Sequence, residues 1–71
     1  MNEHLERAIK KVGSARELAH RVGVTTQAVW LWRNGTTPAP ERVILIEAAT
    51  DGEVSRHDLR PDLWPREGDA A

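Results

Sequence analysis

The chain contains no cysteine, so neither a disulfide nor a thiolate metal site can stabilise it. It also lacks long hydrophobic runs: its apolar stretches are a few residues long, far short of the about 20 that span a bilayer. Residues 1–6, MNEHLE, are polar and partly acidic, unlike the start of a secretory signal. We therefore expect a cytoplasmic protein without a membrane span.

The common catalytic and metal-binding patterns are also missing. The three histidines have no metal-ligand spacing, and there is no nucleophile turn or glycine-rich phosphate loop. Capping or solvation explains three of the glutamates, Glu17, Glu41 and Glu47. We therefore expect no enzymatic activity, no cofactor, no metal and no small-molecule substrate.

With 71 residues the chain has room for one domain, which we place at residues 1–65, followed by a flexible tail at 66–71. Its formal net charge of −1 argues mildly against nucleic-acid binding. However, residues 1–42 carry seven basic and four acidic side chains, whereas residues 43–71 carry three basic and seven acidic ones. A basic first half leaves room for a local phosphate-binding face.

Apolar periodicity predicts an all-α fold of about five short helices. In residues 3–12 the apolar side chains recur at i, i+3, i+4 and i+7, the stripe of an amphipathic helix. Ser14 and Glu17 have the spacing of a capping box for a second helix at about 15–22. Gly23 can adopt a positive φ without a Cβ clash, so it allows a sharp turn after that helix.

A third helix is predicted at about 26–33, with Thr25 as the first choice of N-cap and Thr26 as the second. Its phase turns three side chains inward, Ala28, Val29 and Trp32. Four others share the outer face, again at i, i+3, i+4 and i+7: Gln27, Trp30, Leu31 and Asn34. Two helices joined in this way form a helix-turn-helix, whose second helix enters the DNA major groove.

Two further helices are predicted. Pro40 suits the first position of a helix at about 40–50, because the missing N–H is not needed there. This helix is apolar on more than one side, as expected of a core helix that leaves some surface for a partner. Ser55 and Asp58 give the cap signal of a short helix ending at about 59 or 60.

The C-terminal segment, from about residue 58 onward, carries two expectations. Its apolar residues either cover the core or form a dimer contact: Leu59, Leu63 and Trp64. Local ion pairs are expected to tie the segment to the body, through Asp58, Arg60 and Asp62. Exposed pairs of this kind contribute little to stability.

Two segments resemble known regulators. Residues 22–35, VGVTTQAVWLWRNG, are similar to the recognition unit of phage Cro and repressor proteins. Residues 38–65, PAPERVILIEAATDGEVSRHDLRPDLWP, resemble the YdaS-like group of small Cro-type regulators. The resemblance covers about residues 5–66 and implies a lambda-repressor-like domain of about five helices. It also implies a repressor that binds operator DNA, although some relatives carry a toxin–antitoxin label.

Five residues are expected to contact bases. Gln27 leads, since an amide at the exposed start of the helix can pair with adenine N6 and N7. Thr25 and Thr26 can cap the helix and also touch a phosphate or a thymine methyl. Trp30 and Leu31 depart from the resembled group, where polar residues are usual. Trp30 either meets the sugar–phosphate wall or a thymine methyl, or folds back over the edge of the core.

A second set is expected to contact phosphates at helix ends and in the following loop: Ser14, Arg16, Arg21, Arg33, Asn34 and Thr36. Lys10 and Lys11 are further candidates of this sequence-blind kind. The expected partner is double-stranded operator DNA, bound through the major groove by a homodimer that is weak in solution or forms on the DNA. Its half-sites would lie about 34 Å apart, one helical turn.

The alternative interpretation is a protein-interaction module, for instance a toxin or antitoxin partner that keeps the helix-turn-helix shape. The near-neutral charge and the apolar pair Trp30 and Leu31 favour this alternative.

Overall fold

Five short helices make up the part of the chain that the computed structural model describes, residues 3–65. They are α1 (Glu3–Val12), α2 (Ala15–Val22), α3 (Thr26–Arg33), α4 (Pro40–Ala49) and α5 (Arg56–Leu59). No strand occurs within residues 3–65, so the all-α prediction is confirmed, and the helix boundaries agree with the predicted ones to within a residue. The predicted tail at 66–71 lies outside the described residues.

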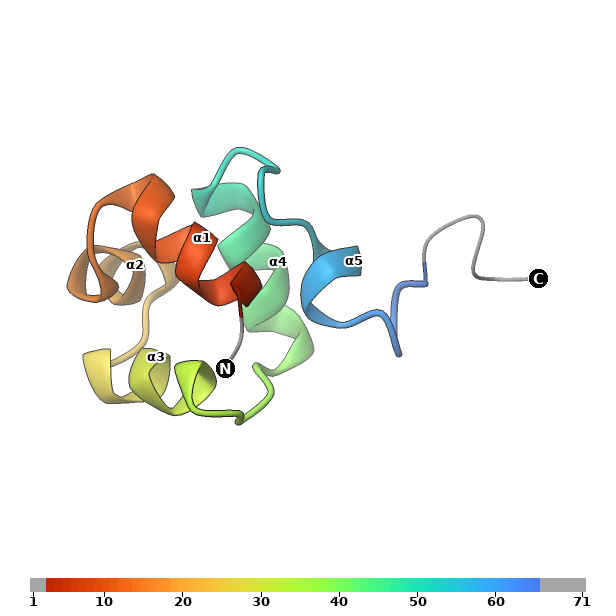
Figure 1. The fold of residues 1–71 in the computed structure, drawn as a ribbon, viewed down its shortest axis with the longest axis horizontal. Helices are drawn as coiled ribbons and strands as arrows, with labels where there is room; N and C mark the ends of the chain where they lie inside the picture. Colours follow the sequence, from red (N-terminus) through yellow and green to blue (C-terminus); the bar gives the residue numbers. More distant parts are fainter. Residues whose placement is uncertain (1–2, 66–71) are drawn as a thin grey trace.

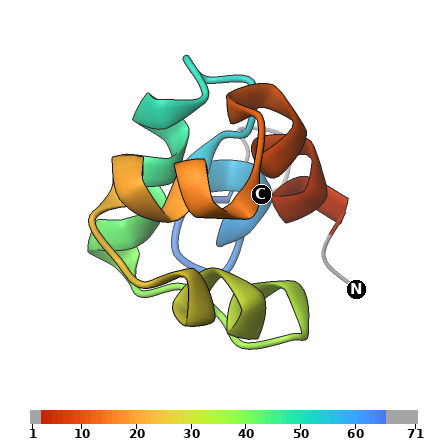
Figure 2. The same ribbon diagram turned by 90° about the vertical axis from the view of Figure 1, so that its left-hand side faces the viewer.

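The arrangement of the helices leaves α3 at one edge of the fold. α2 packs against α1, α3 and α4, while α5 contacts α1 and α4. Figures 1 and 2 show α3 along the lower edge in two perpendicular views, with the loop between α4 and α5 along the upper edge. The second helix of the helix-turn-helix is therefore peripheral, as a helix that enters a groove must be.

All five helices and the loop before α5 contribute to one apolar core: Leu5, Ala8, Leu18, Ala19, Val22, Val29, Trp32, Val43, Ile46, Val54 and Leu59. The inward assignment of Val29 and Trp32 is confirmed, and Trp64 packs against this core from outside. Leu63, by contrast, is 44% exposed. Of the two predicted roles, covering the core therefore applies to Leu59 and Trp64 but not to Leu63.

The N-cap of α2 is confirmed, with one correction. Ser14 Oγ accepts a hydrogen bond from the Glu17 backbone N–H at 3.0 Å. The reciprocal half of the predicted capping box is wrong, because the Glu17 carboxylate accepts from Arg21 Nε at 2.7 Å instead. A guanidinium offers a charge-assisted bond, which is stronger than a bond from a neutral amide. The full capping box predicted for Ser55 and Asp58 does form, at the start of α5.

The turn between α2 and α3 follows the prediction. Gly23 lies in the left-handed region, with φ 82°, and its N–H donates to the Ala19 carbonyl at 2.9 Å. The N–H of Val24 donates to the same oxygen at 3.0 Å, and the Val24 side chain packs against the core. These two hydrogen bonds to the Ala19 carbonyl fix the direction in which the chain leaves α2. They therefore also fix the position at which α3 begins.

Thr50 is a fully buried polar side chain of the core, and no sequence pattern pointed to it. It follows the last residue of α4, and its hydroxyl lies 3.0 Å from the Ile46 carbonyl, to which it donates. The Thr50 hydroxyl oxygen, Oγ1, also accepts a hydrogen bond from the Val54 N–H at 3.2 Å. One hydroxyl thus closes the end of α4 onto the loop that leads to α5.

Glu47 anchors the start of α5 to α4. Its Oε2 accepts the backbone N–H of Arg56 at 3.0 Å, and its Oε1 accepts from Arg56 Nε at 2.9 Å. These two hydrogen bonds hold the pKa of Glu47 below its ordinary value. The bond from the Arg56 side chain has the larger effect, and the bond from the Arg56 backbone N–H comes second. The Arg56 guanidinium also lies over the Trp64 ring, 5.8 Å from its centroid. Glu47 therefore caps another helix and forms an ion pair, beyond simple solvation.

Arg60 ties the end of α5 to the loop before α4. The expected ion pair with Asp62 is present, at 2.8 Å, and its hydrogen bond lowers the pKa of Asp62. Arg60 also donates to the Pro38 carbonyl at 3.0 Å, a bond across the fold. Asp58 serves the capping box of α5.

Within residues 3–65, no helix is both long and apolar enough to cross a membrane. The same residues contain no group of three or more His, Asp or Glu side chains arranged to hold a metal ion.

Candidate nucleic-acid interface

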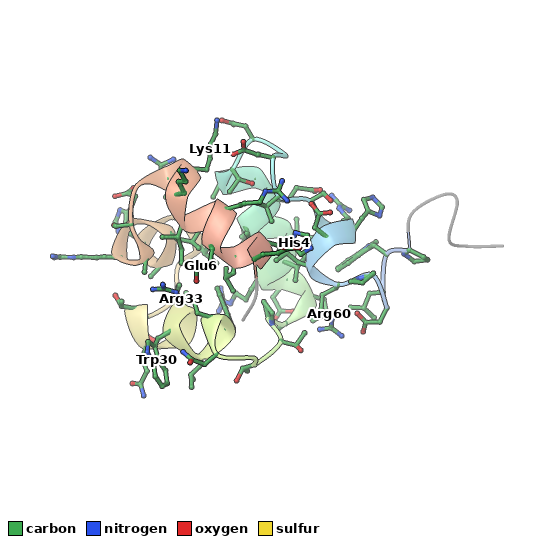
Figure 3. The ribbon with its side chains drawn as sticks, in the orientation of Figure 1. His4, Glu6, Lys11, Trp30, Arg33 and Arg60 are labelled. Carbon is green, nitrogen blue, oxygen red and sulfur yellow. The ribbon has the colours of Figure 1, made fainter. Side chains whose placement is uncertain are left out.

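The helix expected to read DNA is held on one side and open on the other. Thr25 Oγ1 accepts the Ala28 N–H at 3.1 Å, which confirms Thr25 as the N-cap of α3. Val29 and Trp32 are 0% and 6% exposed and fix the inner face of α3 in the core. Figure 3 shows Trp30 on the lower edge of α3, pointing away from the body.

The five expected base-contacting residues lie together on the open side. Thr25, Thr26 and Gln27 are exposed at the start of α3. Trp30 and Leu31 follow one turn later and remain 56% and 40% exposed. The outer face of α3 is therefore polar in its first turn, at Thr26 and Gln27, and apolar in its second turn, at Trp30 and Leu31.

Trp30 does not fold back over the core. It is not among the side chains that pack against the core cluster, and more than half of its surface is open. It lines a shallow hollow together with Glu6, Arg33 and Asn34. Of the two placements considered from the sequence, the structure has the outward one.

Two of the expected phosphate contacts already have partners within the protein. Arg33 donates from Nε to Glu6 Oε2 at 2.7 Å and from Nη2, on the same edge of the guanidinium, to Glu6 Oε1 at 3.1 Å. Asn34 Nδ2 donates to the Trp30 carbonyl at 2.8 Å and so caps the end of α3. Figure 3 shows Glu6 and Arg33 facing one another between α1 and α3. Both side chains have a structural task that the sequence pattern did not indicate.

The remaining expected phosphate contacts are exposed, and two of them also serve α2. Ser14 is the N-cap of α2, and Arg21 pairs with Glu17, whose pKa the Arg21 hydrogen bond lowers. Arg16 and Thr36 are exposed, on α2 and in the loop after α3.

A separate basic group lies on the far side of the molecule. Arg7, Lys10 and Lys11 of α1 line a hollow with Glu53, and Arg7 donates to the Glu53 carbonyl at 2.8 Å. Lys11 and Trp30 lie at opposite edges in Figure 3. Lys11 therefore lies away from the side of the molecule on which Trp30 is exposed.

This geometry defines a class of protein: a small all-α domain with a helix-turn-helix, α2 and α3, whose second helix is capped, anchored and open on its outer face. The comparisons with known proteins identify the family. The model of the family described as "Bacterial toxin YdaS" matches residues 5–67. The chain belongs to the YdaS family, as the resemblance of residues 38–65 had indicated.

The chain is also similar to a curated protein of Escherichia coli (strain K12) named "Putative transcriptional regulator YdaS". The two are 38% identical over 63 residues, which cover 87% of this chain and 64% of that relative. The chain thus spans less than two thirds of the length of the relative. No solved structure matches the chain.

Proposed function

We propose that the protein is a transcriptional regulator that binds double-stranded DNA in a sequence-specific manner, with α3 in the major groove. The observation that carries the proposal is the outer face of α3. Gln27 is exposed in the first turn of this helix, and its amide makes no hydrogen bond within residues 3–65. An amide in this position can donate to and accept from the edge of an adenine.

In this proposal α2 crosses the sugar–phosphate backbone while α3 reads bases. Arg16 and Arg21 on α2 supply charge for phosphates, with Ser14 and Thr36 at the ends of the unit. Arg33 and Asn34 can contact phosphates through the N–H groups that their internal bonds to Glu6 and to the Trp30 carbonyl leave unoccupied.

The finer parts of the proposal concern assembly. We infer a Cro-like repressor in the bacterial cytoplasm that binds a palindromic operator as a homodimer. Ile44 and Leu45 of α4 remain 41% and 40% exposed, which supports an apolar contact between copies. The name of the E. coli relative, a transcriptional regulator, agrees with a regulatory role.

The second candidate function is that of a toxin or antitoxin module that acts by binding another protein. The description of the matched family, a bacterial toxin, favours it, and so do the exposed Trp30 and Leu31. A protein partner would cover these two side chains in the same way that a groove would.

Selection of bound duplexes from a random pool tests the proposal directly. We expect one enriched, two-fold symmetric sequence whose half-sites lie about one helical turn, 10–10.5 base pairs, apart. Replacing Gln27→Ala should weaken binding to that sequence by about tenfold and leave binding to random duplex unchanged. No duplex binding at low salt, together with a stable protein complex recovered from cells, would decide for the second candidate.

A further inference from the structure

We propose that Trp30 and Leu31 read thymine C5-methyl groups, so that the preferred DNA site carries thymines beneath the second turn of α3. This inference rests on the proposed function and names the bases that this half of the helix selects.

Two polar side chains that lie beside Trp30, Arg33 and Asn34, have partners inside the protein. Asn34, which shares their face, donates its amide to the Trp30 carbonyl at 2.8 Å. Arg33 directs the Nε–Nη2 edge of its guanidinium to the Glu6 carboxylate, at 2.7 and 3.1 Å. Both side chains are therefore held in place by internal hydrogen bonds, and a base could use only the N–H groups that these bonds do not occupy.

What this half of the helix does present is apolar. Trp30 and Leu31 are 56% and 40% exposed, although both would be expected to avoid water. The C5-methyl of thymine is the apolar group on the edges of the four bases in the major groove. A large apolar side chain in that groove therefore gains most from a thymine and finds unpaired polar atoms at the other bases.

The outer face of α3 then has two parts with different chemistry. Thr26 and Gln27 in the first turn can form hydrogen bonds, whereas Trp30 and Leu31 in the second turn can contribute mainly by excluding water. Because Val29 and Trp32 hold the helix from the other side, both parts meet the same groove in a fixed register. We therefore expect a half-site that combines a base read by Gln27 with one or two neighbouring thymines.

The test alters the DNA and leaves the protein unchanged, so a folding defect of a protein variant cannot account for the result. In the selected duplex, each thymidine is replaced in turn by deoxyuridine, which removes only the C5-methyl, and affinity is measured by fluorescence anisotropy. At one or two positions per half-site we expect a loss of about fourfold for each methyl that the protein buries.

Protein variants then assign each methyl to its side chain. Trp30→Ala and Leu31→Ala should each bind the thymidine duplex more weakly and should no longer distinguish thymidine from deoxyuridine at one position. Leu63→Ala is the matched control, because Leu63 is 44% exposed, close to the 40% of Leu31, and lies beyond α5. This variant should retain the full effect.

The possible outcomes distinguish a failure of this inference from a failure of the proposed function. Specific binding that is indifferent to deoxyuridine at every position overturns the inference and leaves the proposed regulator intact. Deoxyuridine sensitivity that persists in both Trp30→Ala and Leu31→Ala also overturns it. If no duplex is enriched and a protein partner covers Trp30, the proposed function fails, and this inference fails with it.

Discussion

Arg33 in the last turn of α3 and Glu6 of α1 form a two-point ion pair, with Nε–Oε2 at 2.7 Å and a second bond to Oε1 at 3.1 Å. The two side chains are 39% and 37% exposed, so the pair lies at the surface, beside the hollow that Trp30 lines. It joins the end of the proposed recognition helix to a helix 27 residues away in the sequence. The pair therefore holds the end of α3 against α1 and, under the proposed function, neutralises part of the charge that Arg33 could offer to a phosphate.

Replacing Glu6→Gln should strengthen DNA binding. The change removes an acidic group beside the proposed interface and leaves Arg33 able to contact a phosphate, so the salt dependence should steepen by about one charge. The free energy of unfolding should fall by less than about 1 kcal/mol, because the pair is exposed. Anisotropy titrations at several salt concentrations measure the first effect, and urea unfolding measures the second.

The matched control is Glu53→Gln, which changes the net charge equally at the opposite edge of the fold, beside Lys11. It should alter DNA affinity less than Glu6→Gln does. If Glu6→Gln instead weakens binding to random duplex, the orientation of α3 matters more than the released charge.

Thr50→Val should destabilise the protein by about 1–3 kcal/mol, because it keeps the side-chain shape but leaves the Val54 N–H without its acceptor. For a domain of this size that corresponds to a fall in Tm of at least about 4 °C. Thr50→Ser keeps the hydroxyl and tests the bond separately from the lost methyl. Equal Tm values for Thr50→Val and the parent would show that the hydroxyl bond is dispensable.

Acid should weaken the junction between α4 and α5. The pKa of Glu47 lies below its ordinary value of 4.5 in the folded protein, owing to its bonds with Arg56. As pH falls, the unfolded chain therefore takes up this proton first. The stabilisation is complete above about pH 4.5 and is lost as pH falls through the lowered pKa.

Urea unfolding at neutral pH and at about pH 3 measures this effect. The decline in stability should be shallower for Glu47→Gln than for the parent protein. Glu41→Gln, at the exposed start of the same helix, should follow the parent. An identical decline in all three proteins would remove Glu47 from the acid response.

Gly23→Ala should lower stability by about 1–2 kcal/mol for conformational reasons alone. Gly23 has φ +82°, and a Cβ placed there would meet nothing within 4 Å, so only the backbone opposes the change. Gly23→Asn should be less harmful, because asparagine tolerates the left-handed region better than other side chains. The thermal midpoints of the two variants provide the comparison, and the reverse order would contradict the backbone explanation.

The sequence by itself was sufficient for the helices and their ends, because these depend on neighbouring residues. The cap of α3 is a hydroxyl three positions before the N–H that it accepts, and the turn needs a glycine at position 23. Periodicity likewise separates Val29 and Trp32, which are buried, from Trp30, which is not. For Glu17, even a local prediction was half wrong, because Arg21 competed for its carboxylate.

Only the tertiary structure decided which charged and polar side chains are already engaged. The sequence pattern predicts a phosphate contact for Arg33, and the structure shows that this side chain also pairs with Glu6, 27 positions away in the sequence. Arg60 likewise reaches the Pro38 carbonyl, 22 positions away. Helical periodicity assigns a residue to a face, but it carries no information on which distant side chain the packed helices bring to that face. The sequence alone did not show that Trp30 and Leu31 dominate the second turn of α3. That conclusion required the internal partners of Arg33 and Asn34 to be known.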